Sequence, residues 1–175
     1  IQNLMHILFY KLNESLTSKT DDFRTLALYH LHQNIQSNPA FPWTISYMAK
    51  QLYVCPRLLH KFYYAEFGIS CMQDVIKSRI SMAKEQLAGT DYPVKKIATI
   101  CGYTNTEHFS RQFKKETGLS PKQYWLRLRL DKARQLLTDD TLSVADIAFH
   151  LGFCDEAHFC KLFRRHTGLT PGQYR

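Results

Sequence analysis

A duplicated segment constrains the fold of this chain more than any other feature of its sequence. Residues 94–124 and residues 144–174 align without insertion or deletion, fifty positions apart, and are identical at thirteen of thirty-one positions. The identical residues are mostly apolar residues, glycine and proline, which are the types that define a core and the turns around it. We therefore expect two copies of one structural unit.

The first copy has the pattern of two helices on either side of a sharp turn. Gly102 can adopt the positive φ that such a turn requires. Either Thr104 or Asn105 can cap a second helix, in which Phe109 and Phe113 lie four residues apart and face inward. The first helix has an apolar face at helical spacing, made by Val94, Ile97, Ala98 and Cys101. This is the pattern of a helix-turn-helix unit, whose second helix can enter the major groove of DNA.

The period of fifty residues continues upstream of the two copies. Gly68, Gly118 and Gly168 are fifty residues apart, and so are Arg79 and Arg129. The chain is therefore expected to contain three similar units. A period of this length is typical of repeated architectures.

The first unit, at about residues 44–70, differs from the other two. Ala49 and Leu59 are ten residues apart where the later units have eleven, and no glycine lies in its turn. Long helices at about residues 71–88 and 121–138 join the three units. The sequence therefore predicts an all-α fold of tandem helix-turn-helix subdomains, homeodomain-like three-helical units joined by long linking helices.

The composition indicates the kind of partner and the compartment. The formal charge of +8 favours a polyanion. Five cysteines without a secretion signal fit a reducing, cytoplasmic environment better than a disulfide framework. No run of about 18 apolar residues is present, so no membrane partner is expected.

Catalytic and metal-binding patterns are weak. The sequence has no phosphate-binding glycine loop, paired carboxylates or nucleophile elbow, so we expect no enzymatic activity and no cofactor. Cys154, His158, Cys160 and His166 form a cluster, but only the histidine at position 158 recurs in the middle unit, as His108. A zinc site is therefore not expected.

The spacing of these residues resembles the DNA-binding domain of AraC/XylS-type transcription regulators. The resemblance covers about residues 23–124. It is carried by residues spaced as Ala49-x2-Leu52-x2-Cys55-x3-Leu59, Gly68, Arg79-x3-Ala83-x3-Leu87 and Ile97-Ala98-x3-Gly102-Tyr103-x5-Phe109-x3-Phe113-x4-Gly118-x2-Pro121-x2-Tyr124. The resemblance implies two unlike helix-turn-helix subdomains joined by one long helix, with recognition helices in successive major grooves. It predicts a bacterial, sequence-specific DNA-binding transcription regulator that acts as an activator.

The resemblance also implies which side chains meet DNA. Base contacts are expected from Arg57, His60, Lys61, Thr106, Glu107, Ser110, Arg111, Glu156 and Lys161. Phosphate contacts are expected from Lys95, Lys96, Lys114, Lys115, Arg164 and Arg165. Alternatively, His60 and Ser110 contact only phosphate or water, and Glu107 caps its own helix or repels the DNA backbone.

The domain boundaries and partners follow from this layout. Residues 1–21 are expected to be a linker or dimerisation helix from a missing upstream domain, residues 22–124 the DNA-binding pair, and residues 125–175 a linking helix plus a third unit, which departs from the family pattern. The third unit either contacts a third groove or packs on a partner such as RNA polymerase. The expected partners are double-stranded DNA, RNA polymerase and a second copy in a homodimer; the alternative function is a helical protein-interaction module.

Overall fold

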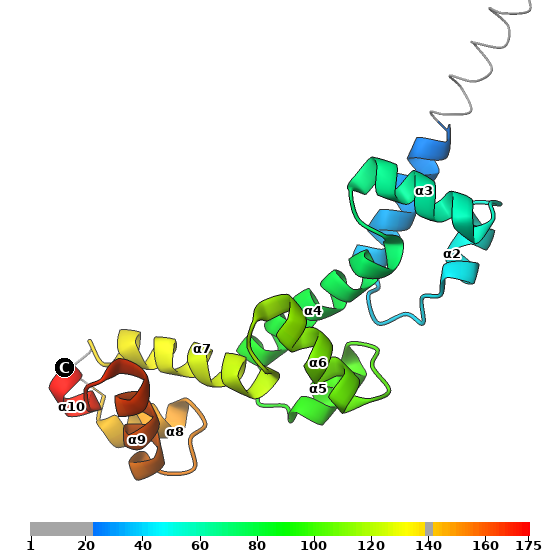
Figure 1. Ribbon diagram of the computed structural model, residues 1–175. Helices are drawn as coiled ribbons and strands as arrows, with labels where there is room; N and C mark the ends of the chain where they lie inside the picture. Colours follow the sequence, from blue (N-terminus) through cyan, green and yellow to red (C-terminus); the bar gives the residue numbers. More distant parts are fainter. Residues whose placement is uncertain (1–22, 139–141) are drawn as a thin grey trace, which may run out of the picture. The chain divides into compact units, whose positions relative to one another are not determined.

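The computed structural model describes residues 23–138 and 142–175 (Figure 1). The expected linker or dimerisation helix of residues 1–21 lies outside these residues. All regular secondary structure in the part of the chain that is described is helical, which confirms the predicted all-α class. The chain divides into two compact units, with the division inside helix α4, between Met82 and Ala83.

The first compact unit contains one complete helix-turn-helix. A helix at residues 23–37 precedes α2 (Ile45–Gln51) and α3 (Pro56–Phe67), and the first part of α4 (Cys71–Gly89) follows. These elements enclose one apolar core, whose buried residues are Leu28, Leu31, Ile35, Trp43, Met48, Ala49, Leu59, Tyr63, Cys71 and Val75. Burial of this apolar surface is the main contribution to the stability of the unit.

The second compact unit contains the other two helix-turn-helix pairs. Its elements after α4 are α5 (Val94–Ile100), α6 (Thr106–Thr117), α7 (Pro121–Leu136), α8 (Val144–His150), α9 (Glu156–Thr167) and α10 (Pro171–Tyr174). The helices α5 and α6 pack on each other, as do α8 and α9, and α7 contacts both α6 and α8 (Figure 1). Helix α7 ends two residues earlier than its predicted end at residue 138.

Side-chain caps explain where the second helix of each later pair begins. The side chain of Asn105, one of the two expected caps, accepts a hydrogen bond from the backbone N–H of His108 at 2.8 Å. Asp155 does the same for the N–H of His158 at 2.6 Å. Each of these caps satisfies a helix N–H that has no partner within the helix.

The three helix-turn-helix turns share one backbone geometry, although only two contain glycine. Gly102 and Gly152 have φ values of 79° and 73°, and Tyr53 occupies the equivalent position with a φ of 54°. After this residue the backbone N–H of Tyr103 donates to the carbonyl of Ala98, and the N–H of Val54 donates to Ala49. The spacing from Ala49 to Leu59 is one residue shorter than in the later helix-turn-helix units, and this difference therefore falls after Val54, just before the N-cap of α3.

A buried polar cluster lies within the first compact unit. Asp74 is 4% exposed, and its Oδ2 accepts hydrogen bonds from the Tyr63 hydroxyl and from His32 Nδ1 at 2.6 Å. The His32 ring stacks on Phe67, with ring centroids 4.5 Å apart. Burial and the Asp74 carboxylate raise the pKa of the Tyr63 hydroxyl, which therefore stays protonated and donating. The cluster fixes α3 and α4 to the preceding helix.

Candidate nucleic-acid interface

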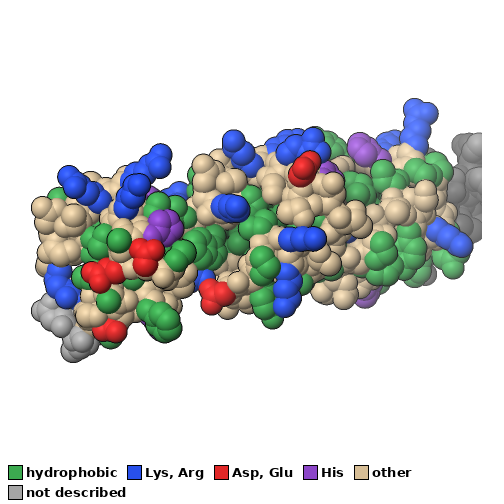
Figure 2. Space-filling model, turned by 90° about the horizontal axis from the view of Figure 1, so that it is seen from below, with side chains coloured by type: hydrophobic (Ala, Val, Ile, Leu, Met, Phe, Trp, Pro, Cys, Tyr) green, Lys and Arg blue, Asp and Glu red, His purple; other side chains and the backbone are tan. Residues whose placement is uncertain are grey.

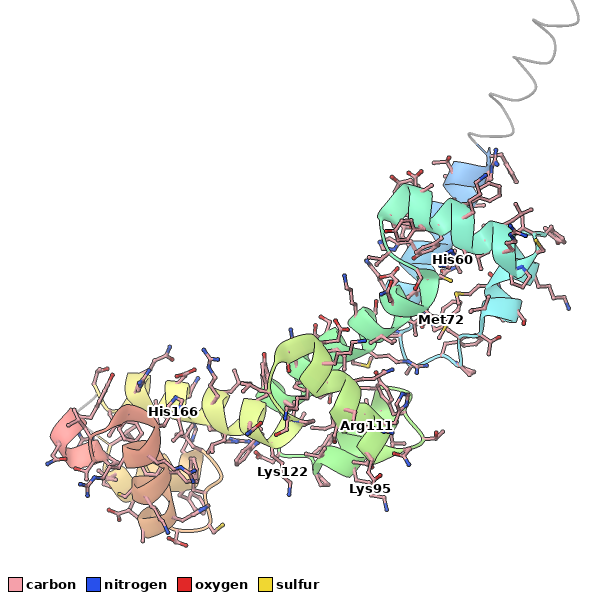
Figure 3. The ribbon with its side chains drawn as sticks, viewed as in Figure 1. His60, Met72, Lys95, Arg111, Lys122 and His166 are labelled. Carbon is pink, nitrogen blue, oxygen red and sulfur yellow. The ribbon has the colours of Figure 1, made fainter. Side chains whose placement is uncertain are left out.

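Helix α3 presents the first group of predicted site residues. Leu59 and Tyr63 are fully buried and lie four residues apart, so they fix which side of the helix faces the core. Arg57, His60 and Lys61 are exposed on the rest of its surface, and His60 is labelled in Figure 3. The His60 ring lies nearly parallel to the ring of Tyr64, with centroids 6.2 Å apart.

Helix α6 repeats this arrangement in the second helix-turn-helix. Phe109 and Phe113 are fully buried, with ring centroids 5.7 Å apart, and point into the core. Exposed side chains occupy the other side of the helix, including Arg111, which is labelled in Figure 3. The exposed members of the predicted set are Glu107, Arg111, Lys114 and Lys115.

Two predicted base contacts on α6 are less accessible than the others. Thr106 and Ser110 are only partly exposed, and the Ser110 hydroxyl donates to the Thr106 carbonyl at 2.8 Å. The Ser110 proton is therefore engaged within its own helix, and its oxygen remains as an acceptor. This geometry suits contact with a donor such as the amino group of a base better than contact with phosphate oxygens.

Helix α9 carries the predicted site residues of the third helix-turn-helix. Phe159 and Phe163 are fully buried and take the places of Phe109 and Phe113. The predicted site residues on its exposed surface are Glu156, Lys161, Arg164 and Arg165. The three recognition-helix candidates thus share one frame, and their exposed residues differ.

Two further lysines lie at the start of α5. Lys95 and Lys96 occupy its first turn and are exposed, and Lys95 is labelled in Figure 3. The Lys96 ammonium lies 3.5 Å from the centroid of the Tyr92 ring, which holds it in a cation–π contact. The Lys95 ammonium makes no hydrogen bond or ion pair within the described residues.

Some basic side chains are bonded within the protein, and others have no partner among the described residues. Arg79 donates to the carbonyls of Pro39 and Phe41, both at 2.9 Å. By contrast, no hydrogen bond or ion pair among the described residues involves the side chains of the predicted cations on the three candidate recognition helices, which are Arg57, Lys61, Arg111, Lys114, Lys115, Lys161, Arg164 and Arg165. On the face shown in Figure 2, Lys and Arg side chains stand out from the surface of both units. Unpaired cations on recognition helices are available to neutralise phosphates.

Arg129 has a role that sequence reasoning did not find. Its Nη1 donates to the Leu151 carbonyl at 2.8 Å, its Nη2 bonds to the Asp91 carboxylate, and its guanidinium lies 4.4 Å from the Trp125 ring centroid. Asp91 precedes the second helix-turn-helix, and Leu151 caps the end of α8 in the third. Arg129 therefore connects the second and third helix-turn-helix units. The fifty-residue spacing between Arg79 and Arg129 was the sequence signal that could have indicated a structural role for Arg129.

The cysteine and histidine cluster of the third unit takes part in other contacts. The His158 ring packs edge-on against Phe153, with centroids 6.3 Å apart. His166 Nε2 lies 3.9 Å from an oxygen of Asp131. Within the described residues, no three His, Cys, Asp or Glu side chains are grouped as metal ligands, and no helix is long and apolar enough to cross a membrane.

Comparison with known proteins identifies the family. A family model described as a helix-turn-helix domain matches residues 48–127 and, separately, residues 110–175. The chain is 45% identical over 109 residues to the HTH-type transcriptional activator RhaS of Yersinia pestis (strain Pestoides F), which covers 62% of this chain and 40% of that protein. It is 32% identical over 105 residues to the uncharacterized HTH-type transcriptional regulator YtdP of Bacillus subtilis (strain 168), covering 60% of this chain and 13% of that protein. The chain thus spans at most 40% of the length of these two relatives.

Solved structures agree with the sequence matches. The C-terminal domain of AraT, a response regulator from Geobacillus stearothermophilus, is 34% identical, has a TM-score of 0.54, and covers 57% of this chain and 83% of its own. An AraC-type transcriptional regulator from Chromobacterium violaceum is 29% identical with a TM-score of 0.53, covering 57% of this chain and 90% of its own. The DNA-binding domain of AdpA, solved with a target DNA, shares the fold at 22% identity and a TM-score of 0.56, covering 58% and 92%. The chain belongs to the AraC/XylS-type family of helix-turn-helix transcription regulators.

Proposed function

We propose that this chain is the sequence-specific DNA-binding part of a bacterial transcription regulator, and that α3 and α6 read bases in successive major grooves. The observation that carries the proposal is the pair of amphipathic recognition helices. Each buries two residues four positions apart, and each exposes cations that no other described residue pairs. Such a helix can enter a groove without first breaking an ion pair.

The exposed side chains can be assigned to bases and to phosphates by their chemistry. Arg57 and Arg111 carry the planar fork that matches the two acceptors of guanine, and Glu107 can accept from the amino group of cytosine. His60, Lys61, Thr106 and Ser110 complete the base contacts, with Ser110 acting as an acceptor. Phosphate contacts come from Lys95, Lys96, Lys114 and Lys115, because a flexible ammonium group recognises charge and not shape.

The regulatory partners extend this proposal. RhaS is named as a transcriptional activator, so we assign activation, with contact to RNA polymerase, to the protein that contains this chain. Residues 1–21, as a linker or dimerisation helix, would bring two copies together on paired sites. A homodimer of this kind predicts an operator with two-fold symmetry.

Selection of bound sites from a random duplex library tests DNA reading directly. The expected result is a motif of two blocks about one helical turn apart, read by α3 and α6. Failure to enrich any sequence at moderate salt would refute sequence-specific binding. It would instead support the alternative of a helical protein-interaction module.

Variants of α6 test the assignment of individual side chains. Arg111→Ala should reduce affinity for the selected site by about 1–3 kcal/mol while leaving random duplex binding nearly unchanged. Arg111→Lys is the matched control, because it keeps the charge and loses the fork; it should lose the same specificity. Lys114→Ala and Lys115→Ala should each weaken all duplexes alike and reduce the salt slope by about 1. Equal losses on both duplexes for Arg111→Ala would refute its role in reading a base.

A further inference from the structure

The second and third helix-turn-helix units have the same aromatic packing in their cores and different exposed surfaces. Phe113 and Tyr124 have ring centroids 5.4 Å apart in an edge-on contact, and Phe163 and Tyr174 have the same separation and geometry. The two Phe pairs of α6 and α9 differ by only 0.1 Å in centroid separation, at 5.7 Å and 5.6 Å. Differences in function between the units must therefore come from the exposed side chains.

The N-terminal half of α9 is poorly suited to reading bases. Its N-cap is the carboxylate Asp155 where α6 has the amide Asn105, and the exposed carboxylate Glu156 follows immediately. The first turns of a recognition helix are the part that reaches base edges. Two adjacent carboxylates there oppose entry between two phosphate backbones, although they stabilise the helix through its dipole.

The other accessible positions of this half, one exposed and one partly exposed, offer little to a base edge. Ala157 stands where α6 has Glu107, and Cys160 stands where α6 has Ser110. Burial, followed by the nearby Glu156 carboxylate, raises the pKa of the Cys160 thiol, so the thiol is neutral at neutral pH. A neutral thiol is only a weak hydrogen-bond donor.

The C-terminal half of α9 has the opposite character. A surface depression of about 580 Å³ lies beside it, and its lining residues are Cys160, Lys161, Arg164, Arg165, Gly168 and Thr170. The side chains of Lys161, Arg164 and Arg165 are exposed and have no hydrogen-bonded or ion-paired partner among the described residues.

Comparison with α6 shows that the change favours anions. Arg164 and Arg165 stand where α6 has Lys114 and Lys115, and His166 stands where α6 has Glu116. Arginine binds the oxygens of a phosphate through two parallel donors, which lysine cannot do. One carboxylate has thus been removed from this end of the helix and two forked donors have been added.

We infer that the third unit is a sequence-tolerant anchor, in which Lys161, Arg164 and Arg165 bind phosphodiester groups of duplex DNA and α9 reads no base. The inference rests on the proposed function. It moves Lys161 from the expected base contacts to the phosphate contacts and gives Glu156 no base to read. The DNA that the protein covers is then longer than the sequence it selects.

The test compares salt dependence with sequence preference for the full chain. The variant Lys161→Ala/Arg164→Ala/Arg165→Ala should bind the selected site and a random duplex more weakly by the same factor. Its slope of log affinity against log salt should be smaller by about 2.7, at about 0.9 for each phosphate contact. Between 50 and 200 mM salt the wild type should therefore lose roughly 40-fold more affinity than the variant.

A charge-conserving variant separates phosphate binding from base reading. Arg164→Lys/Arg165→Lys should keep nearly the whole salt slope, because the slope counts the charges that neutralise phosphates and does not depend on the forked geometry of the contact. A third block in the selected motif would overturn the inference, and so would a loss confined to the selected site or an unchanged slope in the triple-alanine variant. Absence of any DNA binding by the wild type would instead refute the proposed function on which the inference rests.

Discussion

Replacing Tyr53 by glycine should stabilise the first compact unit. Tyr53 is the only residue other than glycine with a positive φ among the described residues, at 54°. Its side chain is 97% exposed, so the substitution removes almost no packing. The equivalent positions of the later units are Gly102 and Gly152, which adopt this conformation without a steric penalty.

The magnitude follows from two opposing contributions. A residue with a Cβ in the left-handed region costs about 1–2 kcal/mol, and this cost disappears in Tyr53→Gly. Glycine adds about 0.5–1 kcal/mol of conformational entropy to the unfolded chain, which favours unfolding. The net expectation is an increase of about 0.5–1 kcal/mol in the free energy of unfolding.

The tryptophan content of the chain provides the assay. The sequence has two tryptophans, Trp43 in the first compact unit and Trp125 in the second. In a Trp125→Phe background, urea unfolding followed by fluorescence reports on the first unit alone. With m of about 2 kcal/mol per molar urea, the midpoint should rise by about 0.3–0.5 M.

Two further variants determine whether the backbone conformation is responsible. Tyr53→Ala keeps a Cβ in the left-handed region and should leave the midpoint nearly unchanged. Gly152→Ala should destabilise the second unit by about 1 kcal/mol, since its φ is 73° and an added Cβ would meet other atoms no closer than 3.5 Å. A midpoint that falls in Tyr53→Gly, or rises equally in Tyr53→Ala, would refute the assignment of strain to this turn.

Three other predictions follow from buried and bridging groups. Asp74→Ala should destabilise the first compact unit by about 3 kcal/mol, because the hydroxyl of the fully buried Tyr63 loses its acceptor. Asp74→Asn keeps an oxygen there and should cost less than half as much. Equal costs of the two variants in urea unfolding would contradict this reason. Arg129→Ala should destabilise the second compact unit by about 2–3 kcal/mol, measured through Trp125 fluorescence in a Trp43→Phe background. Asp91→Ala should cost under about 1 kcal/mol, because the Asp91 side chain is 82% exposed. Similar costs for the two variants would place the stabilisation in the ion pair. Burial raises the pKa of the Cys71 thiol above its ordinary value of 9.0, so the unfolded chain releases this proton at lower pH than the folded chain. The stability of the first compact unit should therefore be complete below about pH 8 and fall as the pH rises above 9.0. In Cys71→Ala this fall should begin only at the higher pH at which tyrosine ionises, and an identical pH profile would exclude the thiol as its source.

The fold could be predicted from the sequence because its local signals agree with each other. Gly102 lies where the turn requires a positive φ, and Phe109 and Phe113 lie where the second helix must face the core. The conformation of Tyr53 could not be predicted, since a tyrosine carries no preference for the left-handed region. That conformation is imposed by the two helices that the turn joins.

The candidate interface was predictable only as far as a helical pattern specifies which side faces out. The exposure of Arg57, Arg111 and Lys114 follows directly from the positions of the buried residues. The engaged proton of Ser110 depends on a side-chain rotamer, which the sequence does not encode in any visible pattern. The bridge from Arg129 to Leu151 depends on tertiary packing, so only the structure could distinguish it from the available cations.

The two family matches overlap on residues 110–127, which hold most of α6 and the start of α7. These elements lie at the junction of two consecutive helix-turn-helix units, and each unit is followed by the same capped start of a new helix. Ser70 with Gln73, Ser120 with Gln123 and Thr170 with Gln173 exchange the same reciprocal hydrogen bonds. An additional unit can therefore join the last helix without disturbing the cores already formed. The core and the exposed face of a unit can then vary separately, so the third unit keeps its frame while it presents the surface that we propose binds phosphates.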